Sequence, residues 1–280
     1  MDIERQYETI EQLKRSDVKA LENWIASQPH LPKTSESHLI LVLFSCEFDL
    51  ERTKKCLEFY YTIRASYTSV FANRDPELPR IIQGLKSYIF EPFPQLTNDG
   101  YGVFYAKLIN PAIDNYDFHT QMKLMDMRVH VWLREVGCVK GITFIIDMTG
   151  SSIRHLHKLG YFNGRKALSY MLEGLPVRLR AVHIVHPTNF VDAVFTIVHP
   201  LISAELRSNL HVHHGDSILD VLPKNCIPNE LNGTGGAVDD LHKNFIETIK
   251  KNRDYFLEDE QYKADESKRV KQGLLKRFGF

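Results

Sequence analysis

Short β-rich runs alternate with helical patterns from residue 103 onward, and this alternation constrains the fold more than any other feature of the sequence. Between the first two runs, apolar residues from Phe118 to Val136 recur three or four apart, as on one face of a helix. Repeated β-α-β units predict a mainly parallel sheet with helices packed against it, and therefore an α/β fold. Four runs have the length and residue types of strands: VFYAKLI (103–109), ITFIID (142–147), AVHIV (181–185) and LHVHH (210–214).

The N-terminal part of the chain shows helical periodicity and no strand pattern. Apolar or semi-apolar residues recur three or four apart from Leu50 to Ile63, and Asp49 precedes them as an expected helix cap. Two polar stretches that contain proline, NRDPELP (73–79) and EPFPQLTN (91–98), are expected to be connections.

These patterns divide the chain into three expected parts. A helical lobe occupies residues 1–75, the α/β domain occupies 76–245, and a charged helical tail occupies 246–280. Apolar residues stand four apart from Val270 to Phe278 among lysines and arginines. Such a segment suits an anionic membrane surface, and it equally suits a solvated helix docked on its own domain.

The charge balance excludes some classes of function. The chain has 35 Lys and Arg against 35 Asp and Glu, so no global field draws it onto DNA or RNA, and we expect no nucleic-acid partner. The charged, helical N-terminus does not resemble a secretory signal, and no run approaches 18 apolar residues. The spacing of the four cysteines, Cys46, Cys56, Cys138 and Cys226, does not suggest a disulfide framework. We therefore expect a soluble, cytoplasmic protein with reduced thiols.

Common catalytic motifs are absent from the sequence. There is no G-x-G-x-x-G dinucleotide fingerprint, no G-x-x-x-x-G-K-[ST] phosphate loop and no G-x-S-x-G nucleophile elbow. The serines Ser151 and Ser152 stand at a strand end, but no motif activates their hydroxyls. We therefore expect a protein that is not an enzyme and needs no cofactor, with an α/β enzyme of unrecognised site as the weakest alternative.

Thirteen histidines raise the question of a metal site. Strand alternation puts His211 and His213 on one face and His214 on the other, so that only a pair converges locally. No H-E-x-x-H or Cys/His spacing accompanies them or the pair His155 and His157. We expect structural, hydrogen-bonded histidines and no metal ligands.

Three separated blocks carry a resemblance to a known family. The stretch 175–236, which begins LPVRLRAVHIVHPTNFVDAVFTIVHPLI, the strand GITFIIDMTG (141–150) and the helical FDLERTKKCLEFYYTIR (48–64) occur in family order. Together they resemble the CRAL-TRIO lipid-binding family, in particular its tocopherol- and retinaldehyde-binding branch. The resemblance covers about residues 10–245.

The resemblance implies a helical N-terminal lobe and a CRAL-TRIO domain that encloses one hydrophobic molecule behind a mobile gate helix. The run 190–202 is apolar around more than half of its circumference, which suits such a gate and also an ordinary buried helix. Plain core packing is the alternative for every residue that matches a ligand-facing position. The matching positions, with the apolar residues of the gate, are Ile142, Ile146, Leu159, Ala167, Tyr170, Met171, Leu175, Val191, Val194, Phe195 and Val198. Among these, Tyr170 offers a phenol that could bind a ligand hydroxyl.

Family members also have a basic cleft for anionic lipid headgroups beside the gate. This chain departs from that pattern because Cys46, Glu205 and Asn209 stand at basic positions. We therefore expect transient contact with anionic membranes and weak or absent phosphoinositide selectivity. The matching basic residues that remain are Lys55, Arg178, Arg180 and Arg207.

The expected function is that of a carrier for one small hydrophobic ligand, such as a tocopherol, a retinoid, a carotenoid or another lipid, which it exchanges at membranes. The alternative is a lipid-occupied sensor or adaptor that acts through a protein partner. Affinity in either case comes from the burial of apolar surface, at roughly 25 cal/mol per Å².

Overall fold

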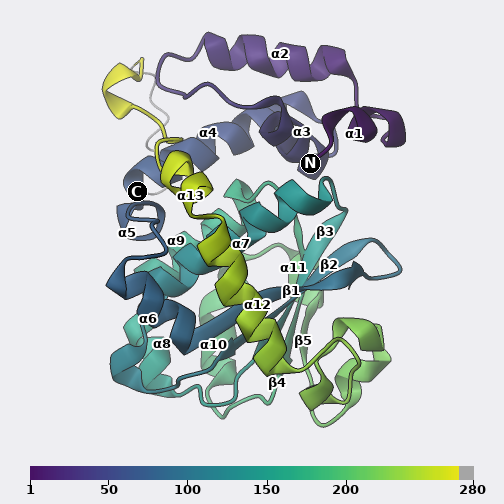
Figure 1. The fold of residues 1–280 in the computed structure, drawn as a ribbon, viewed down its shortest axis with the longest axis vertical. Helices are drawn as coiled ribbons and strands as arrows, with labels where there is room; N and C mark the ends of the chain where they lie inside the picture. Colours follow the sequence, from purple (N-terminus) through teal and green to yellow (C-terminus); the bar gives the residue numbers. More distant parts are fainter. Residues whose placement is uncertain (271–280) are drawn as a thin grey trace.

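A five-stranded sheet forms the centre of the computed structural model, which describes residues 1–270 (Figure 1). The strands follow chain order across the sheet, with β1 antiparallel to β2 and every later neighbour parallel. The predicted α/β class and the mainly parallel sheet are therefore confirmed. The strands are β1 (Tyr88–Leu96), β2 (Tyr101–Leu108), β3 (Gly141–Asp147), β4 (Leu179–Val185) and β5 (Leu210–Val212).

Helices cover the sheet and form a separate layer at the N-terminal end, drawn at the top of Figure 1. The N-terminal helices are α1 (Ile3–Thr9), α2 (Arg15–Ala26), α3 (Glu36–Ser45), α4 (Leu50–Ser66), α5 (Thr68–Phe71) and α6 (Pro79–Ser87). The later helices are α7 (Phe118–Val136), α8 (Ile153–Leu159), α9 (Tyr161–Ser169), α10 (Val191–Val198), α11 (Ala204–Ser208), α12 (Val238–Lys251) and α13 (Arg253–Asp259). A π-helical turn, η2 (Tyr170–Gly174), follows α9 and packs against α4.

Local sequence signals set the helix ends. The expected cap Asp49 accepts a hydrogen bond from the Arg52 backbone N–H at 3.0 Å and begins α4. Asp117 caps α7 in the same way, and Gly137 ends that helix with a φ of +82°, a conformation that glycine adopts without steric cost. The long apolar helix predicted from Phe118 to Val136 is thus present with both ends marked.

The connection predicted at 91–98 is wrong for most of that stretch. Residues from Glu91 to Leu96 belong to β1, the antiparallel edge strand of the sheet. Prolines are tolerated there because an edge strand pairs on one side only. The charge of Glu91 hides the strand pattern, yet its carboxylate is fully buried against the Arg128 guanidinium of α7, at 2.7 and 2.9 Å.

The C-terminal helices pack along the domain rather than forming a separate unit in the described part. Helix α12 packs against β1 and α7, and it runs across the division predicted at residue 245. The three-part division itself stays a prediction. In the expected tail, Arg269 forms an ion pair with Glu58 of α4, whereas Leu274 and Phe278 lie outside the described residues.

Four buried charges join the N-terminal helices to α7 and α13. Arg74 contacts Asp126 at 2.7 Å, and Arg64 contacts Asp259 at 2.6 Å. All four side chains are less than 10% exposed. Burial alone would raise the pKa of both carboxyl groups, but the two guanidinium groups hold the pKa of Asp126 and of Asp259 below the ordinary value. We call these four residues the charge cluster.

We expect Asp126→Asn to lower the free energy of unfolding by about 3–5 kcal/mol, because it leaves two buried guanidinium groups facing one carboxylate. Urea titration at pH 7 measures this loss. The exposed pair of Asp240 with Lys243 gives the matched control, and Asp240→Asn should change stability by no more than about 0.5 kcal/mol. Equal effects of the two substitutions would contradict a stabilising role for the charge cluster.

The Asp126→Asn substitution should also change how the free energy of unfolding depends on pH. A carboxyl group whose folded pKa is depressed contributes stability above its unfolded pKa of about 3.9, and this contribution is lost as pH falls through the folded value. The wild type should therefore lose stability steeply below about pH 4. The Asp126→Asn variant should show a shallower loss, because one such carboxyl group is gone.

Candidate functional site: an apolar cavity beneath helix α10

An apolar cavity of about 350 Å³ lies between one face of the sheet and the helices α7, α9, α10 and α11. This volume falls at the lower end of the range for small-molecule sites. Its lining comprises Tyr88, Ile89, Phe90, Ala106, Tyr116, Phe118, Gln121, Met122, Met125, Phe144, Ile146, Leu159, Leu168, Met171, Leu179, Val182, Ile184, Val194, Phe195, Val198, Ile202, Leu206 and Leu210.

The periodicity of the elements explains why this lining is apolar. Phe144 and Ile146 of β3 are two residues apart and therefore face the same side of the sheet, as do Val182 and Ile184 of β4. Helix α7 presents Met122 and Met125 among other residues from its first half. Apolar side chains from alternate positions of the strands and from one face of α7 therefore line the same cavity.

Three polar side chains interrupt the apolar lining, namely Tyr88, Tyr116 and Gln121. The Tyr88 hydroxyl is buried, and no hydrogen-bond partner for it lies among the described residues. Burial raises the pKa of Tyr88 well above its ordinary value, so the hydroxyl keeps its proton at neutral pH. The hydroxyl packs against Gly84 of α6, which does not line the cavity, so it is the ring of Tyr88 that contributes to the lining. Tyr88 is not among the residues predicted from the sequence, because it lies in the strand that the sequence patterns did not indicate.

Helix α10 covers the cavity but makes few buried contacts with the rest of the domain. Val194, Phe195 and Val198 line the cavity, and each is partly exposed. None of the α10 side chains that the structure describes is buried. The Phe195 ring stacks on His199, with 5.1 Å between the ring centroids. Few buried contacts hold this helix in place, and that is the local condition for low-energy opening.

Six of the eleven residues predicted for the cavity line it. These are Ile146, Leu159, Met171, Val194, Phe195 and Val198. Ile142, Ala167 and Leu175 are buried in contacts outside this lining, and Val191 is partly buried against the core. The binding role of the eleven stays a prediction.

Tyr170 does not line the cavity, contrary to the expectation that its phenol faces a ligand. The hydroxyl donates a hydrogen bond to Asp126 of the charge cluster, and the ring meets Phe71 edge-on at 4.9 Å. Burial turns the side chain toward the ion pairs because a buried hydroxyl needs a partner. The sequence could not show that partner, since it lies 44 residues away.

The predicted basic residues occupy different places and do not form one cleft. Lys55 and Arg178 line a separate, basic pocket of about 430 Å³, together with Arg52 and Cys46. The Arg178 guanidinium is already engaged, because it donates to the Ser45 carbonyl and to the Glu47 carboxylate. The carboxylate of Glu47 thereby offsets the charge that Arg178 brings to this pocket.

Arg180 and Arg207 lie apart from that pocket. The Arg180 guanidinium lies 3.4 Å from the Glu205 carboxylate and donates to the Lys140 carbonyl at 3.2 Å. Arg207 donates to the carbonyl of His199, at the end of α10, at 2.7 Å. The carboxylate of Glu205 therefore offsets the charge of Arg180 at a position where the sequence departs from the family pattern.

Three of the histidines in the predicted clusters and strands form hydrogen bonds within the protein, namely His155, His183 and His213. His183 Nδ1 lies 2.9 Å from His213 Nε2, and burial together with His211 and His213 lowers the pKa of His183 to about 3. His155 Nδ1 accepts a hydrogen bond from the Ser152 backbone N–H at 3.0 Å and stabilises the start of α8. Within residues 1–270, no group of three or more His, Cys, Asp or Glu side chains is arranged to hold a metal ion.

Comparison with known proteins identifies the fold family. Residues 86–233, more than half of the chain, match the CRAL/TRIO domain, and residues 10–81 match the Pinta-like UBA domain. The chain belongs to the CRAL/TRIO family. This membership confirms the resemblance found in the sequence. Its relatives include proteins named as alpha-tocopherol transfer protein-like and as clavesins.

Named relatives match across most of the chain. The mouse alpha-tocopherol transfer protein-like protein is 26% identical over 235 residues, which is 82% of this chain and 68% of that protein. Clavesin-1 of Xenopus laevis is 22% identical over 228 residues, covering 78% of this chain and 67% of that protein. The solved structure of Sfh5 superposes with a TM-score of 0.49 at 13% identity, covering 84% of this chain and 88% of that one.

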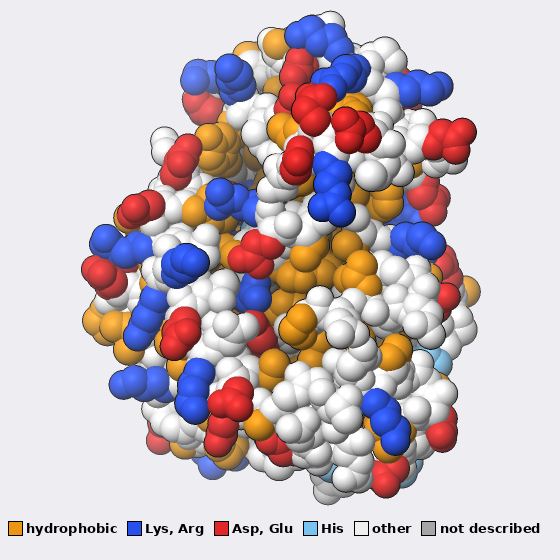
Figure 2. Space-filling view, turned by 45° about the vertical axis from the view of Figure 1, so that its right-hand side comes forward, with side chains coloured by type: hydrophobic (Ala, Val, Ile, Leu, Met, Phe, Trp, Pro, Cys, Tyr) orange, Lys and Arg blue, Asp and Glu red, His pale blue; other side chains and the backbone are white. Residues whose placement is uncertain are grey.

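No helix among residues 1–270 is both long and apolar enough to cross a membrane. On the face drawn in Figure 2, Lys and Arg alternate with Asp and Glu, and hydrophobic side chains gather in a hollow near its centre. This face therefore presents no large field of one sign.

We expect Tyr170→Phe to lower the free energy of unfolding by about 1.5–3 kcal/mol, because the charged carboxylate of Asp126 loses the hydrogen bond that the Tyr170 hydroxyl donates to it. The fluorescence of bound cis-parinaric acid, a probe for the apolar cavity, should give the same affinity as in the wild type. A lower probe affinity with unchanged stability would show instead that Tyr170 contacts the ligand.

Proposed function

We propose that this chain is a carrier that binds one small hydrophobic lipid in the apolar cavity and exchanges it at membrane surfaces when α10 moves aside. The observation that supports this most is an apolar cavity covered by a helix with no buried side chain in its described part. Family membership supports the lipid class of ligand. The particular lipid, the gating movement and the membrane step are parts of the proposal.

The composition of the cavity defines the expected cargo. Its walls are apolar or aromatic, so affinity comes mainly from buried apolar area at roughly 25 cal/mol per Å². The amide of Gln121 suits a single hydroxyl or carbonyl on the ligand. A lipid with one small polar group therefore fits better than a lipid with a charged headgroup. The lining contains no nucleophile or acid-base pair, which supports binding without chemical turnover.

Opening of α10 is plausible at a membrane for a physical reason. In water, moving the helix exposes the apolar side chains of Val194, Phe195 and Val198 together with the cavity itself. At a lipid surface these side chains enter an apolar phase instead, so the open state costs less there. Membrane contact and ligand release are thereby coupled.

A second surface suits membrane contact, and the sequence patterns did not indicate it. Phe162 is 82% exposed at the start of α9, Tyr161 beside it is 49% exposed, and Ile153 of α8 is 42% exposed. Exposed aromatic side chains among cations bind the interface of anionic membranes. The exposed basic residues of the same two helices are Arg154, Lys158 and Arg165. We call this surface the α8–α9 patch.

We expect Ala106→Phe to abolish lipid retention, because the larger side chain fills part of the cavity. The protein is exposed to a natural lipid extract, recovered by gel filtration and analysed by mass spectrometry. The wild type should retain one species at a near-stoichiometric amount. Ala193→Phe, the same change on the exposed side of α10, should retain it as well. Equal retention by both variants, or none by a folded wild type, would contradict the carrier.

We expect Phe162→Ser to slow lipid transfer to anionic vesicles about 10-fold, because the vesicle interface loses one exposed aromatic side chain that would insert into it. The equilibrium affinity for lipid should not change. Leu257→Ser, at a residue of α13 that is 41% exposed, serves as the matched control. Fluorescence transfer between donor and acceptor vesicles measures the rate.

Two outcomes of that assay test the finer parts of the proposal. Vesicles with phosphatidylinositol bisphosphate at equal total charge should give the same rate, because Glu47 and Glu205 already pair with Arg178 and Arg180. A wild type that holds its lipid without transferring it would instead support the sensor or adaptor.

A further inference from the structure

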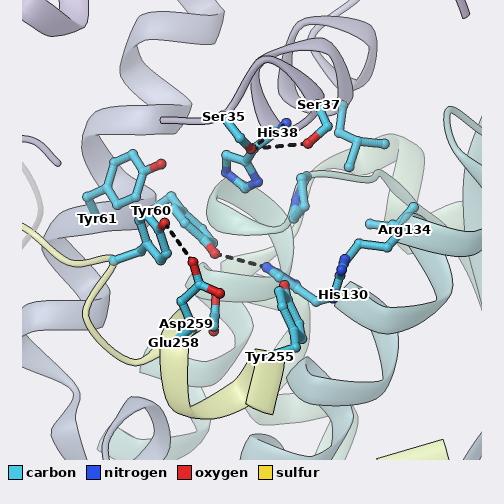
Figure 3. Close-up of a pocket in the computed structure, with 14 residues that line it drawn as sticks. Ser35, Ser37, His38, Tyr60, Tyr61, His130, Arg134, Tyr255, Glu258 and Asp259 are labelled. Atoms are coloured by element: carbon cyan, nitrogen blue, oxygen red, sulfur yellow. Dashed lines mark hydrogen bonds between the residues drawn. The ribbon is translucent and has the colours of Figure 1, made fainter. Parts of the chain in front are cut away.

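A second cavity, of about 270 Å³, lies between the N-terminal helices and the C-terminal end of the domain (Figure 3). Helices α3, α4, α7 and α13 all contribute to its walls. It shares no lining residue with the apolar cavity beneath α10. It therefore requires its own explanation, independent of lipid carriage.

Aromatic faces line the interior of this second cavity. The ring of His38 lies 4.8 Å from that of Tyr60, and the Tyr60 ring stacks on His130 at 5.8 Å with a 12° interplanar angle. Tyr61 and Tyr255 also line the cavity. Figure 3 shows that these side chains project from different helices into the region of one cavity. Such walls favour a planar aromatic ligand, which stacks on rings or meets them edge-on.

Two buried nitrogens of the residues that line this cavity have no hydrogen-bond partner among the described residues, but one of them, His130 Nδ1, lies 3.8 Å from the carboxylate of Asp126 in the charge cluster. His38 Nε2 is buried, and no hydrogen-bond partner for it lies among the described residues. By contrast, the Tyr60 hydroxyl pairs with His130 Nε2 at 2.9 Å, and the Tyr61 hydroxyl pairs with Thr34 at 2.7 Å. A buried polar atom without a partner is costly, so His38 Nε2 is the position where a ligand gains a hydrogen bond.

The charges around the cavity balance. Asp259 is neutralised by Arg64 within the charge cluster. On the rim, Arg134 lies over the Tyr255 ring at 4.0 Å, and the carboxylate of Glu258 lines another side. Burial, together with nearby His130, lowers the pKa of His38 to about 3, so the imidazole is neutral at physiological pH. A charged ligand would lose its hydration here without a net opposite charge to compensate it.

The size of the cavity sets the size of the ligand. A cavity of roughly 150 Å³ accommodates benzene in a protein core. A cavity of about 270 Å³ therefore suits a fused two-ring aromatic molecule.

We propose that this second cavity binds a neutral, planar, two-ring aromatic molecule whose single polar group forms a hydrogen bond with His38 Nε2. The ligand contacts α3, α4, α7 and α13 together, and it therefore stabilises the junction of the N-terminal helices with the domain. The proposal stands independently of lipid carriage, because the two cavities have no residue in common.

The full-length protein and three naphthalene probes test the ligand class. Calorimetric titration should show one equivalent of 2-naphthol bound. The anion 2-naphthoate and the cation 2-naphthylmethylammonium should bind at least 10-fold more weakly, because their charges find no compensation. Tighter binding of either ion, or no binding of 2-naphthol, would overturn the proposal.

Three variants test the place and the hydrogen bond. His38→Phe should weaken 2-naphthol binding about 10-fold and leave unsubstituted naphthalene unaffected, a difference that general loss of structure would not produce. His38→Gln, which keeps a hydrogen-bonding group, should restore most of the affinity. Ser37→Trp should block the cavity, because Ser37 lines it.

A control separates this cavity from the lipid site. Ala106→Phe fills the apolar cavity and should leave 2-naphthol binding unchanged. If Ala106→Phe abolishes binding and Ser37→Trp does not, the probe occupies the apolar cavity and the proposal is wrong. A failure of the carrier proposal would leave this result unaffected.

Discussion

The charge cluster is the interaction on which the arrangement of the other elements depends. Arg64 comes from α4, Arg74 follows α5, Asp126 lies in α7 and Asp259 ends α13, so that residues from four segments meet in four ion pairs of 2.6 to 3.9 Å. Buried ion pairs add little stability relative to well-packed apolar residues, but any misplacement leaves an unpaired charge in the core and is costly. The cluster therefore fixes how the N-terminal helices, α7 and α13 sit relative to one another.

Helix α7 connects this cluster to the apolar cavity. Its residues Met122 and Met125 line the cavity, whereas Asp126 and His130 face the ion pairs and the second cavity. Because Asp126 also accepts the hydrogen bond of Tyr170, the turn after α9 is held on the same helix. The α7 wall of the apolar cavity is thus built on an element that the charge cluster holds in place, and the side toward α10 is not.

The sequence predicted those parts of the fold and site that depend on local periodicity. The spacing from Phe118 to Val136 and the run ITFIID (142–147) indicated α7 and β3 nearly to the residue, because burial of one face dictates both patterns. Periodicity could not supply partners. Glu91 in β1 and Tyr170 after α9 take their roles from Arg128 and Asp126, which lie 37 and 44 residues away. Apolar cavity residues were therefore found more readily than polar ones.

Helix α10 is the moving part in the proposed carrier, because the contacts that hold it differ in kind from those of α7. A helix held by buried polar pairs must break costly interactions in order to leave, whereas α10 is held by partly exposed apolar side chains and one carbonyl contact, from Arg207 to His199. Water opposes the exposure of Phe195 and its neighbours, and a lipid surface does not. The closed state in solution and the proposed open state at a membrane would both follow from one property of the helix. The packing of α10 against the domain is mostly hydrophobic. The free energy of this packing therefore depends on whether the helix faces water or lipid.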